Sequence, residues 1–258
     1  MNKAELEKLF LNLTEHSRKS NSDLPSFVDS KEVVNALSEV KREAWKKLLS
    51  SVASVEATED DVLKPVAEFF NSEPVLKNYL QSHAQDEYFH AELFKGYVKE
   101  TFSYVKTKRS LTDQLIYDRA LPFLANRAQN RPIPFALAVL FYERYASFFY
   151  EKLKTQAAVD GLRGLVRLIE AVEKDERRHM IGIESVVHYI QLEKKIDFID
   201  RVSTRSLLEL LLVDVNQSRY AIYNRKVRRS MQAIGIDPDY ICEKGKWSAK
   251  QVYSLMEA

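Results

Sequence analysis

The pentad Asp-Glu-x-x-His occurs twice in this chain, at residues 86–90 and 175–179, although the chain has only five histidines. Both copies lie in segments with a helical pattern of apolar residues. Glutamate and histidine three positions apart on a helix lie about 60° apart around its axis, so each pentad offers one carboxylate and one imidazole from the same face. Two such faces opposed in a bundle form a site for two metal ions, and the repeat therefore predicts a dinuclear centre between helices.

The composition favours one large, mainly helical globular domain. An apolar content of 45% over 258 residues can bury a substantial core, and six glycines and seven prolines are few for a turn-rich β fold. The formal net charge of +2 gives no reason to expect nucleic acid as a partner.

Nothing in the sequence predicts export or insertion into a membrane. The first residues lack the apolar stretch of a signal peptide, and no uncharged run reaches the roughly 18 residues that a membrane span needs. Cys242 is the only cysteine, which excludes an intrachain disulfide and a cysteine ligand set. We therefore expect a cytoplasmic protein without a membrane span.

The apolar pattern predicts an all-α fold built from two helical hairpins. Short turns join the helices within each hairpin, whereas some 26 residues separate the hairpins, so a four-helix bundle of this kind needs a long crossover. We expect an N-terminal arm at 1–29 with a weak helix at 3–13, a helical domain at 30–234 that includes a further helix at 200–234, and a tail at 235–258. The helices of the bundle are predicted at 30–70 with a kink or break at Pro65, 73–105, 134–156 and 161–192, with a shorter helix at 112–128 in the crossover.

Counting outward from each turn predicts the partner of each pentad glutamate. Glu143 and Glu176 lie 33 residues apart, about 14 residues before and 16 residues after the turn, so both sit about 20–24 Å from it and level with each other. The same count pairs Glu87 with Glu56, 31 residues upstream. Glu43 is the alternative, and it would require a break before Pro65 and an intervening short helix.

The predicted metal ligands are thus four carboxylates and two imidazoles, Glu56, Glu87, His90, Glu143, Glu176 and His179. Such an oxygen-rich set suits iron or manganese better than a closed zinc site. Without metal, four carboxylates in an apolar bundle would repel one another and raise each other's pKa, which makes a purely structural role hard to justify.

This arrangement resembles the ferritin-like di-iron carboxylate superfamily. The resemblance covers roughly residues 40–192 and includes the paired Glu-x-x-His helices, the lone upstream glutamates and the long crossover. It implies that Asp86 orients His179 and that Asp175 orients His90 across the bundle. The extra C-terminal helix and the absence of a cysteine pair favour the oxygenase, desaturase and N-oxygenase branches over ferritin proper.

Three further positions bear on the branch. His83, four residues before Glu87, could be a third imidazole ligand or a neighbour of the ligands. The N-oxygenases of the superfamily carry such a histidine on the other pentad helix, where this chain has Val172. Ser147 occupies the place where monooxygenases have a hydroxyl near the oxygen-binding face, and Phe94 stands where ribonucleotide reductase small subunits have their radical-forming tyrosine.

The resemblance implies a non-haem di-iron oxygenase that uses O2 as co-substrate at two iron ions, with manganese as an alternative metal. Such an enzyme would hydroxylate, N-oxygenate or desaturate a small organic or acyl substrate with electrons from an external donor, and a homodimer is left open. The alternatives are a ferroxidase or rubrerythrin-like detoxification protein and an aldehyde-deformylating enzyme acting on fatty acyl chains. No short motif encodes the shape of a cavity, so the sequence does not predict which substrate is used.

Overall fold

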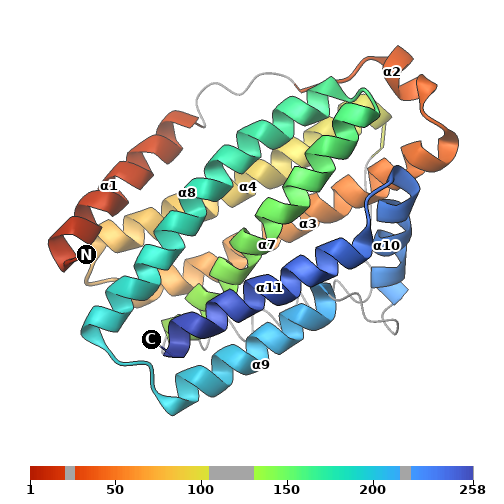
Figure 1. Ribbon diagram of the computed structural model, residues 1–258. Helices are drawn as coiled ribbons and strands as arrows, with labels where there is room; N and C mark the ends of the chain where they lie inside the picture. Colours follow the sequence, from red (N-terminus) through yellow and green to blue (C-terminus); the bar gives the residue numbers. More distant parts are fainter. Residues whose placement is uncertain (21–26, 105–130, 216–221, 258) are drawn as a thin grey trace.

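The structure, a computed structural model, describes residues 1–20, 27–104, 131–215 and 222–257 (Figure 1). These residues form helices and contain no strand, and the crossover helix predicted at 112–128 lies outside them. The helices are α1 (Lys3–Ser20), α2 (Lys31–Ala36), α3 (Glu39–Phe69), α4 (Pro74–Phe102), α7 (Pro132–Val159), α8 (Arg163–Glu193), α9 (Phe198–Val215), α10 (Ile222–Ile234) and α11 (Pro238–Glu257).

Two tight turns make hairpins of α3 with α4 and of α7 with α8, as the sequence predicts. At the second turn Gly161 has a φ of +75°, and the amides of Gly161 and Leu162 bond the carbonyls of Ala158 and Ala157 at 3.1 and 2.9 Å. Glycine adopts this left-handed conformation without strain, so it ends α7 sharply. The two helices of the hairpin therefore run back along each other.

Asp29 fixes the start of α8 to the chain that precedes α2. Its buried carboxylate accepts hydrogen bonds from the amides of Gly164 and Leu165 at 2.8 and 3.2 Å, and from the hydroxyl of Tyr97 at 2.7 Å. A carboxylate at a helix N-terminus satisfies amides that have no partner within the helix and interacts favourably with the helix dipole. A Cβ at Gly164 would lie 2.9 Å from the backbone of Val28, so only glycine permits this close approach.

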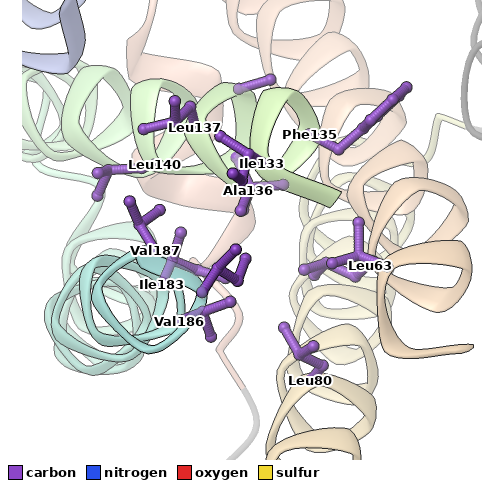
Figure 2. Packing of buried hydrophobic residues seen from close by; sticks show 14 of the residues in the cluster. Leu63, Leu80, Ile133, Phe135, Ala136, Leu137, Leu140, Ile183, Val186 and Val187 are labelled. Carbon is purple, nitrogen blue, oxygen red and sulfur yellow. The ribbon is translucent and has the colours of Figure 1, made fainter. Parts of the chain in front are cut away.

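The four helices of the hairpins share two apolar clusters with a polar layer between them. Figure 2 shows the first cluster, in which Leu63 of α3, Leu80 of α4, Leu140 of α7 and Ile183 of α8 belong to one packed group. The second cluster lies further along the same helices and includes Trp45, Phe94, Leu153 and Leu168. On each helix the glutamates predicted as ligands fall between the residues of the two clusters, so the polar layer is enclosed from both ends.

Two helices differ from the sequence prediction. Of the kink or break expected at Pro65, the break does not occur, because α3 runs on to Phe69 and buries Leu63, Val66 and Ala67 in the core. Proline costs a helix one hydrogen bond, but this cost falls near the helix end and the burial offsets it. α1 continues beyond residue 13 to Ser20. Its buried face begins with the apolar residues Leu6 and Phe10 but continues with polar side chains, so the pattern of apolar residues does not reveal the full length of the helix.

The C-terminal region also differs from the sequence prediction. The single helix expected at 200–234 is α9 and α10, with residues between them that lie outside the described part of the chain. The segment expected as a tail forms α11, which packs on α7 and α9 and buries Ile241, Ala249 and Val252. Among the described helices, none combines the length and the apolar character needed to cross a membrane.

Gly182 tests how tightly α8 packs beside the polar layer. A Cβ at this position would lie 1.8 Å from the hydroxyl oxygen of Tyr79, whose hydroxyl reaches the carbonyl of His179 at 3.4 Å. We expect Gly182→Ala to lower the free energy of unfolding by about 1–3 kcal/mol because the buried ring of Tyr79 has to move. Denaturant unfolding measures the change.

The matched control for this prediction is Gly96→Ala in α4. A Cβ there meets nothing within 4 Å, so the same substitution should stabilise the helix by about 0.5–1 kcal/mol. A Gly182→Ala protein as stable as the wild type would show that α8 does not pack on Tyr79 in this way.

Candidate metal centre

The polar layer brings together the six residues that the sequence predicts as metal ligands and His83, the additional candidate. All of them are buried, with at most 6% of their surface exposed. They come from all four helices of the two hairpins, Glu56 from α3, His83, Glu87 and His90 from α4, Glu143 from α7, and Glu176 and His179 from α8.

One half of the layer contains His83, Glu87, Glu143 and His179. The Nε2 atom of His83 lies 2.7 Å from Oε1 of Glu143 and 3.2 Å from Oε1 of Glu87. The Nδ1 atom of His179 lies 2.8 Å from the same Glu87 oxygen. The two imidazole rings stack at 3.7 Å, so both present a nitrogen to the same two carboxylates.

The other half contains Glu56, Glu87, His90 and Glu176. The Nδ1 atom of His90 lies 3.3 Å from Oε1 of Glu176, 3.4 Å from Oε2 of Glu56 and 3.5 Å from Oε2 of Glu87. Glu87 thus turns one oxygen toward each half of the layer. It is the residue that both halves share.

The geometry of these groups fits a pair of divalent cations. In each half, four potential ligand atoms, one per residue, lie within 4.8 Å of one another. Buried oxygen and nitrogen atoms of Glu56, Glu87, Glu176 and the three imidazoles make no hydrogen bond of good geometry to any described residue. Such atoms cost free energy unless something binds them. Oxygen and imidazole donors without thiolate are the ligands that iron and manganese prefer.

Burial sets the protonation of the metal-free layer. It raises the pKa of Glu56 to about 8, and the nearby charges of Glu87 and Glu176 act in the same direction. Burial, together with the neighbouring His179, lowers the pKa of His83 to about 4, so His83 is neutral at pH 7 with a nitrogen free to bind a cation. For His179, burial is outweighed by the charge of Glu87 and the hydrogen bond to Asp86, which together raise the pKa to about 9.

Two aspartates hold the outer nitrogens of two imidazoles. Asp86 lies 3.1 Å from Nε2 of His179, and Asp175 lies 3.4 Å from Nε2 of His90. In both rings Nδ1 faces the carboxylates of the layer, as it would if the aspartates fix the ring orientation and the tautomer that leaves Nδ1 available. Their roles stay predictions, but the structure places both beside the expected histidines.

Arg178 and Ser17 complete this arrangement, and the sequence analysis missed both. Arg178 donates to Asp86 at 2.6 Å and to Asp175 at 2.7 Å, which ties the two aspartates together. Ser17 of α1 donates to Asp86 at 2.7 Å. Arg178 could have been found because it lies within the second pentad, whereas no local signal marks Ser17, since its partner lies 69 residues away.

Tyr150 is a further residue that the sequence analysis did not select. Its buried hydroxyl donates to Glu56, and its ring stacks on Phe94 with centroids 5.9 Å apart. Burial and the adjacent Glu56 charge hold the pKa of Tyr150 well above its usual range, so the phenol keeps its proton. The spacing in the sequence could have pointed to Tyr150, because it follows Glu143 by seven residues and therefore shares its helix face.

Two sequence candidates lie outside the layer. Glu43 is half exposed and pairs with Lys46 at 2.5 Å, so the structure brings Glu56, and not this alternative, to the other carboxylates. Ser147 is partly buried on α7, and its hydroxyl donates to the carbonyl of Arg144 at 2.8 Å. Ser147 belongs to neither half of the layer, and its role near an oxygen-binding face stays a prediction.

No protein-family model matches the chain, and no curated protein matches it. Solved structures of R2-like ligand-binding oxidases are similar to it along nearly the whole length. One, with an aerobically reconstituted metal cofactor after photoconversion, is 19% identical with a TM-score of 0.69, covering 96% of this chain and 93% of its own. A single-residue mutant with an anaerobically reconstituted Mn/Fe cofactor is 16% identical with a TM-score of 0.70 at the same coverage. The all-α, ferritin-like fold predicted from the sequence is therefore confirmed.

The raised pKa of Glu56 predicts how the metal-free protein responds to pH. The folded state holds the Glu56 proton up to about pH 8, whereas the unfolded chain releases it near 4.5. The stabilising contribution is therefore complete below about pH 4.5 and is lost as the pH rises through about 8. We expect Glu56→Gln to flatten this fall in the free energy of unfolding, measured by urea unfolding after chelation between these two pH values.

The control for the pH prediction is Glu43→Gln, the same chemical change at an exposed ion pair. It should leave the pH dependence of unfolding as in the wild type. If the free energy of unfolding falls with pH equally steeply in Glu56→Gln and in the wild type, the burial of a protonated Glu56 is contradicted.

Proposed function

We propose that this chain is a dinuclear metal oxidase that uses O2 to oxidise a small organic or acyl compound. The observation that carries the proposal is the enclosed layer of four carboxylates and three imidazoles in two halves that share Glu87. Solved structures with the same fold are described as ligand-binding oxidases with a reconstituted Mn/Fe cofactor, which supports the same interpretation.

Each half of the layer would hold one ion. His83, Glu143 and His179 would bind the first ion, and Glu56, His90 and Glu176 the second, with Glu87 bound to both. Four negative carboxylates then balance the charge of two divalent ions, which removes the repulsion that the metal-free layer carries. When bound, a reduced pair of iron ions, or one iron and one manganese, supplies the electrons that activate O2.

The chain itself holds the reacting groups in place and keeps water out. Asp86 and Asp175 orient two of the imidazoles, and Arg178 links the two aspartates. The hydroxyl of Tyr150 holds one oxygen of Glu56, which leaves the other directed toward His90. The apolar clusters on both sides would exclude bulk water, so that the substrate rather than solvent would occupy the space beside the layer.

Oxygen uptake by the metal-loaded protein tests the proposal. We expect the protein loaded anaerobically with ferrous iron, or with iron and manganese, to consume O2 in proportion to its bound metal when an external reductant is present. Glu87→Gln should lower metal affinity at least about 10-fold and uptake with it, because this residue serves both ions.

The matched control is Glu43→Gln, which makes the same chemical change at the surface and should keep wild-type uptake. The absence of bound iron or manganese after anaerobic loading would contradict the proposal. So would an O2 uptake that Glu87→Gln leaves unchanged.

His83 should act as a ligand of the first ion only. Its nitrogen lies 2.7 Å from Glu143 and it belongs to one half of the layer. We expect His83→Gln to weaken one of two stepwise metal affinities at least about 10-fold and to leave the other near its wild-type value. Competition with a chromophoric chelator measures both steps.

The control for His83 is His188→Gln, because His188 is partly exposed and contacts only the backbone of Met1 among the described polar partners. If both stepwise metal affinities of His83→Gln stay at their wild-type values, this imidazole forms a hydrogen bond with Glu143 and does not bind metal.

A further inference from the structure

We propose that the exposed face around Trp247 is the docking surface for a small acidic electron-transfer protein. The Trp247 face consists of Phe148, Tyr240, Lys244, Lys246 and Trp247, which lie on α7 and α11. Figure 1 shows α11 in front of part of α7, and α7 carries Glu143 of the candidate metal centre. The inference rests on the proposed function and identifies where its electrons enter.

The aromatic part of this face is preformed and open. Trp247 is 46% exposed, and its ring packs edge-to-face on Phe148 with centroids 5.5 Å apart. The ammonium of Lys244 lies 4.7 Å from the centroid of Phe148 and 5.3 Å from that of Tyr240. An exposed tryptophan held in place by its neighbours offers a large contact area at little cost in side-chain entropy, which is typical of the residues that dominate protein interfaces.

The charge of the face fits an acidic partner. Lys246 and Lys250 flank Trp247 on α11, and Lys244 and Lys152 lie over the aromatic rings. The acidic residues nearby are fewer. Asp239 pairs with Arg228 at 2.5 Å and Glu151 lies 4.0 Å from Lys152, which leaves Glu243 beside the lysines of α11. A local excess of cations on a chain with a net charge of only +2 would steer a negatively charged protein to this face.

A short path leads from this face to the candidate centre. Phe148 follows Glu143 by five residues on α7, which corresponds to about 7.5 Å along the helix. The next residue, Phe149, lies 6.0 Å from Tyr150 between ring centroids, and Tyr150 donates its hydroxyl hydrogen bond to Glu56. A carrier bound at Trp247 would therefore stand over α7, the helix that carries both Glu143 and Tyr150, and Tyr150 contacts Glu56.

The electron balance defines the class of partner. An oxidase that reduces O2 needs electrons returned to its metal pair, and each encounter would oxidise the carrier by one electron and reduce the pair by one. Two encounters restore both electrons, and no atoms are exchanged. A small acidic [2Fe–2S] ferredoxin has the required charge and one-electron chemistry.

Binding of an oxidised plant-type [2Fe–2S] ferredoxin to the metal-loaded full-length chain tests the inference. We expect a Kd that weakens as salt is added, and a further loss of at least about 10-fold in Trp247→Ala and in Lys246→Glu. The matched control is Lys195→Glu, the same charge change at an exposed position beside α9, which should shift the Kd less than about 2-fold. Helix content and unfolding by denaturant check that each variant is folded.

Three results would overturn the inference. The first is no binding of the ferredoxin at low salt, and the second is an equal loss in Lys195→Glu and Lys246→Glu, which would show unspecific attraction. The third is a dimer in sedimentation that Trp247→Ala dissociates, which would assign the face to a second copy of this chain. Repeating the titration after chelation separates this question from the proposed function, because docking does not depend on bound metal whereas O2 uptake does.

Discussion

The burial of four carboxylates in an apolar interior is the constraint on which the rest of the structure depends. Glu56, Glu87, Glu143 and Glu176 lie together with almost no exposure, where charge is costly unless it is paired. Without metal, burial keeps the proton on Glu56 up to about pH 8 and keeps His83 neutral at pH 7, so the layer avoids part of its charge by shifting pKa values. Two divalent cations would balance the charge of all four carboxylates, which is the physical reason for the proposed function.

Much of the remaining structure serves to keep these side chains level with one another. The turn at Gly161 and the contacts of Asp29 fix where α8 begins, and thereby the height of Glu176 and His179 in the bundle. Asp160 accepts hydrogen bonds from Lys41 at 2.6 Å and from Trp45 at 2.9 Å, which ties the same turn to α3. These contacts lie far from the layer, yet they set the register that brings four helices to one site.

Regular helical geometry explains why most of the candidate site could be predicted from the sequence. The spacing of each pentad predicts which side chains share a face, and counting from a tight turn predicts Glu143 and Glu56, because antiparallel helices rise by the same amount per residue. The structure brings both beside the pentad residues. The choice between Glu56 and Glu43 needed the structure, since it depends on whether α3 continues through Pro65.

Contacts between distant segments account for the features that the sequence did not predict. Ser17 reaches Asp86 only because α1 packs on α4, and a polar residue at the end of a weak helix gives no sign of this. The separate courses of α9, which packs on α7, and α10, which packs on α3, likewise depend on distant contacts, because helical periodicity alone predicts one long helix as readily as two shorter ones.

Anomalous diffraction at the iron and manganese absorption edges, from crystals of the metal-loaded protein, tests the central claim most directly. We expect two peaks inside the bundle. One should lie among His83, Glu143 and His179 and the other among Glu56, His90 and Glu176, with Glu87 in contact with both. A single peak, or metal bound only at surface residues while the layer remains metal-free, would contradict the account.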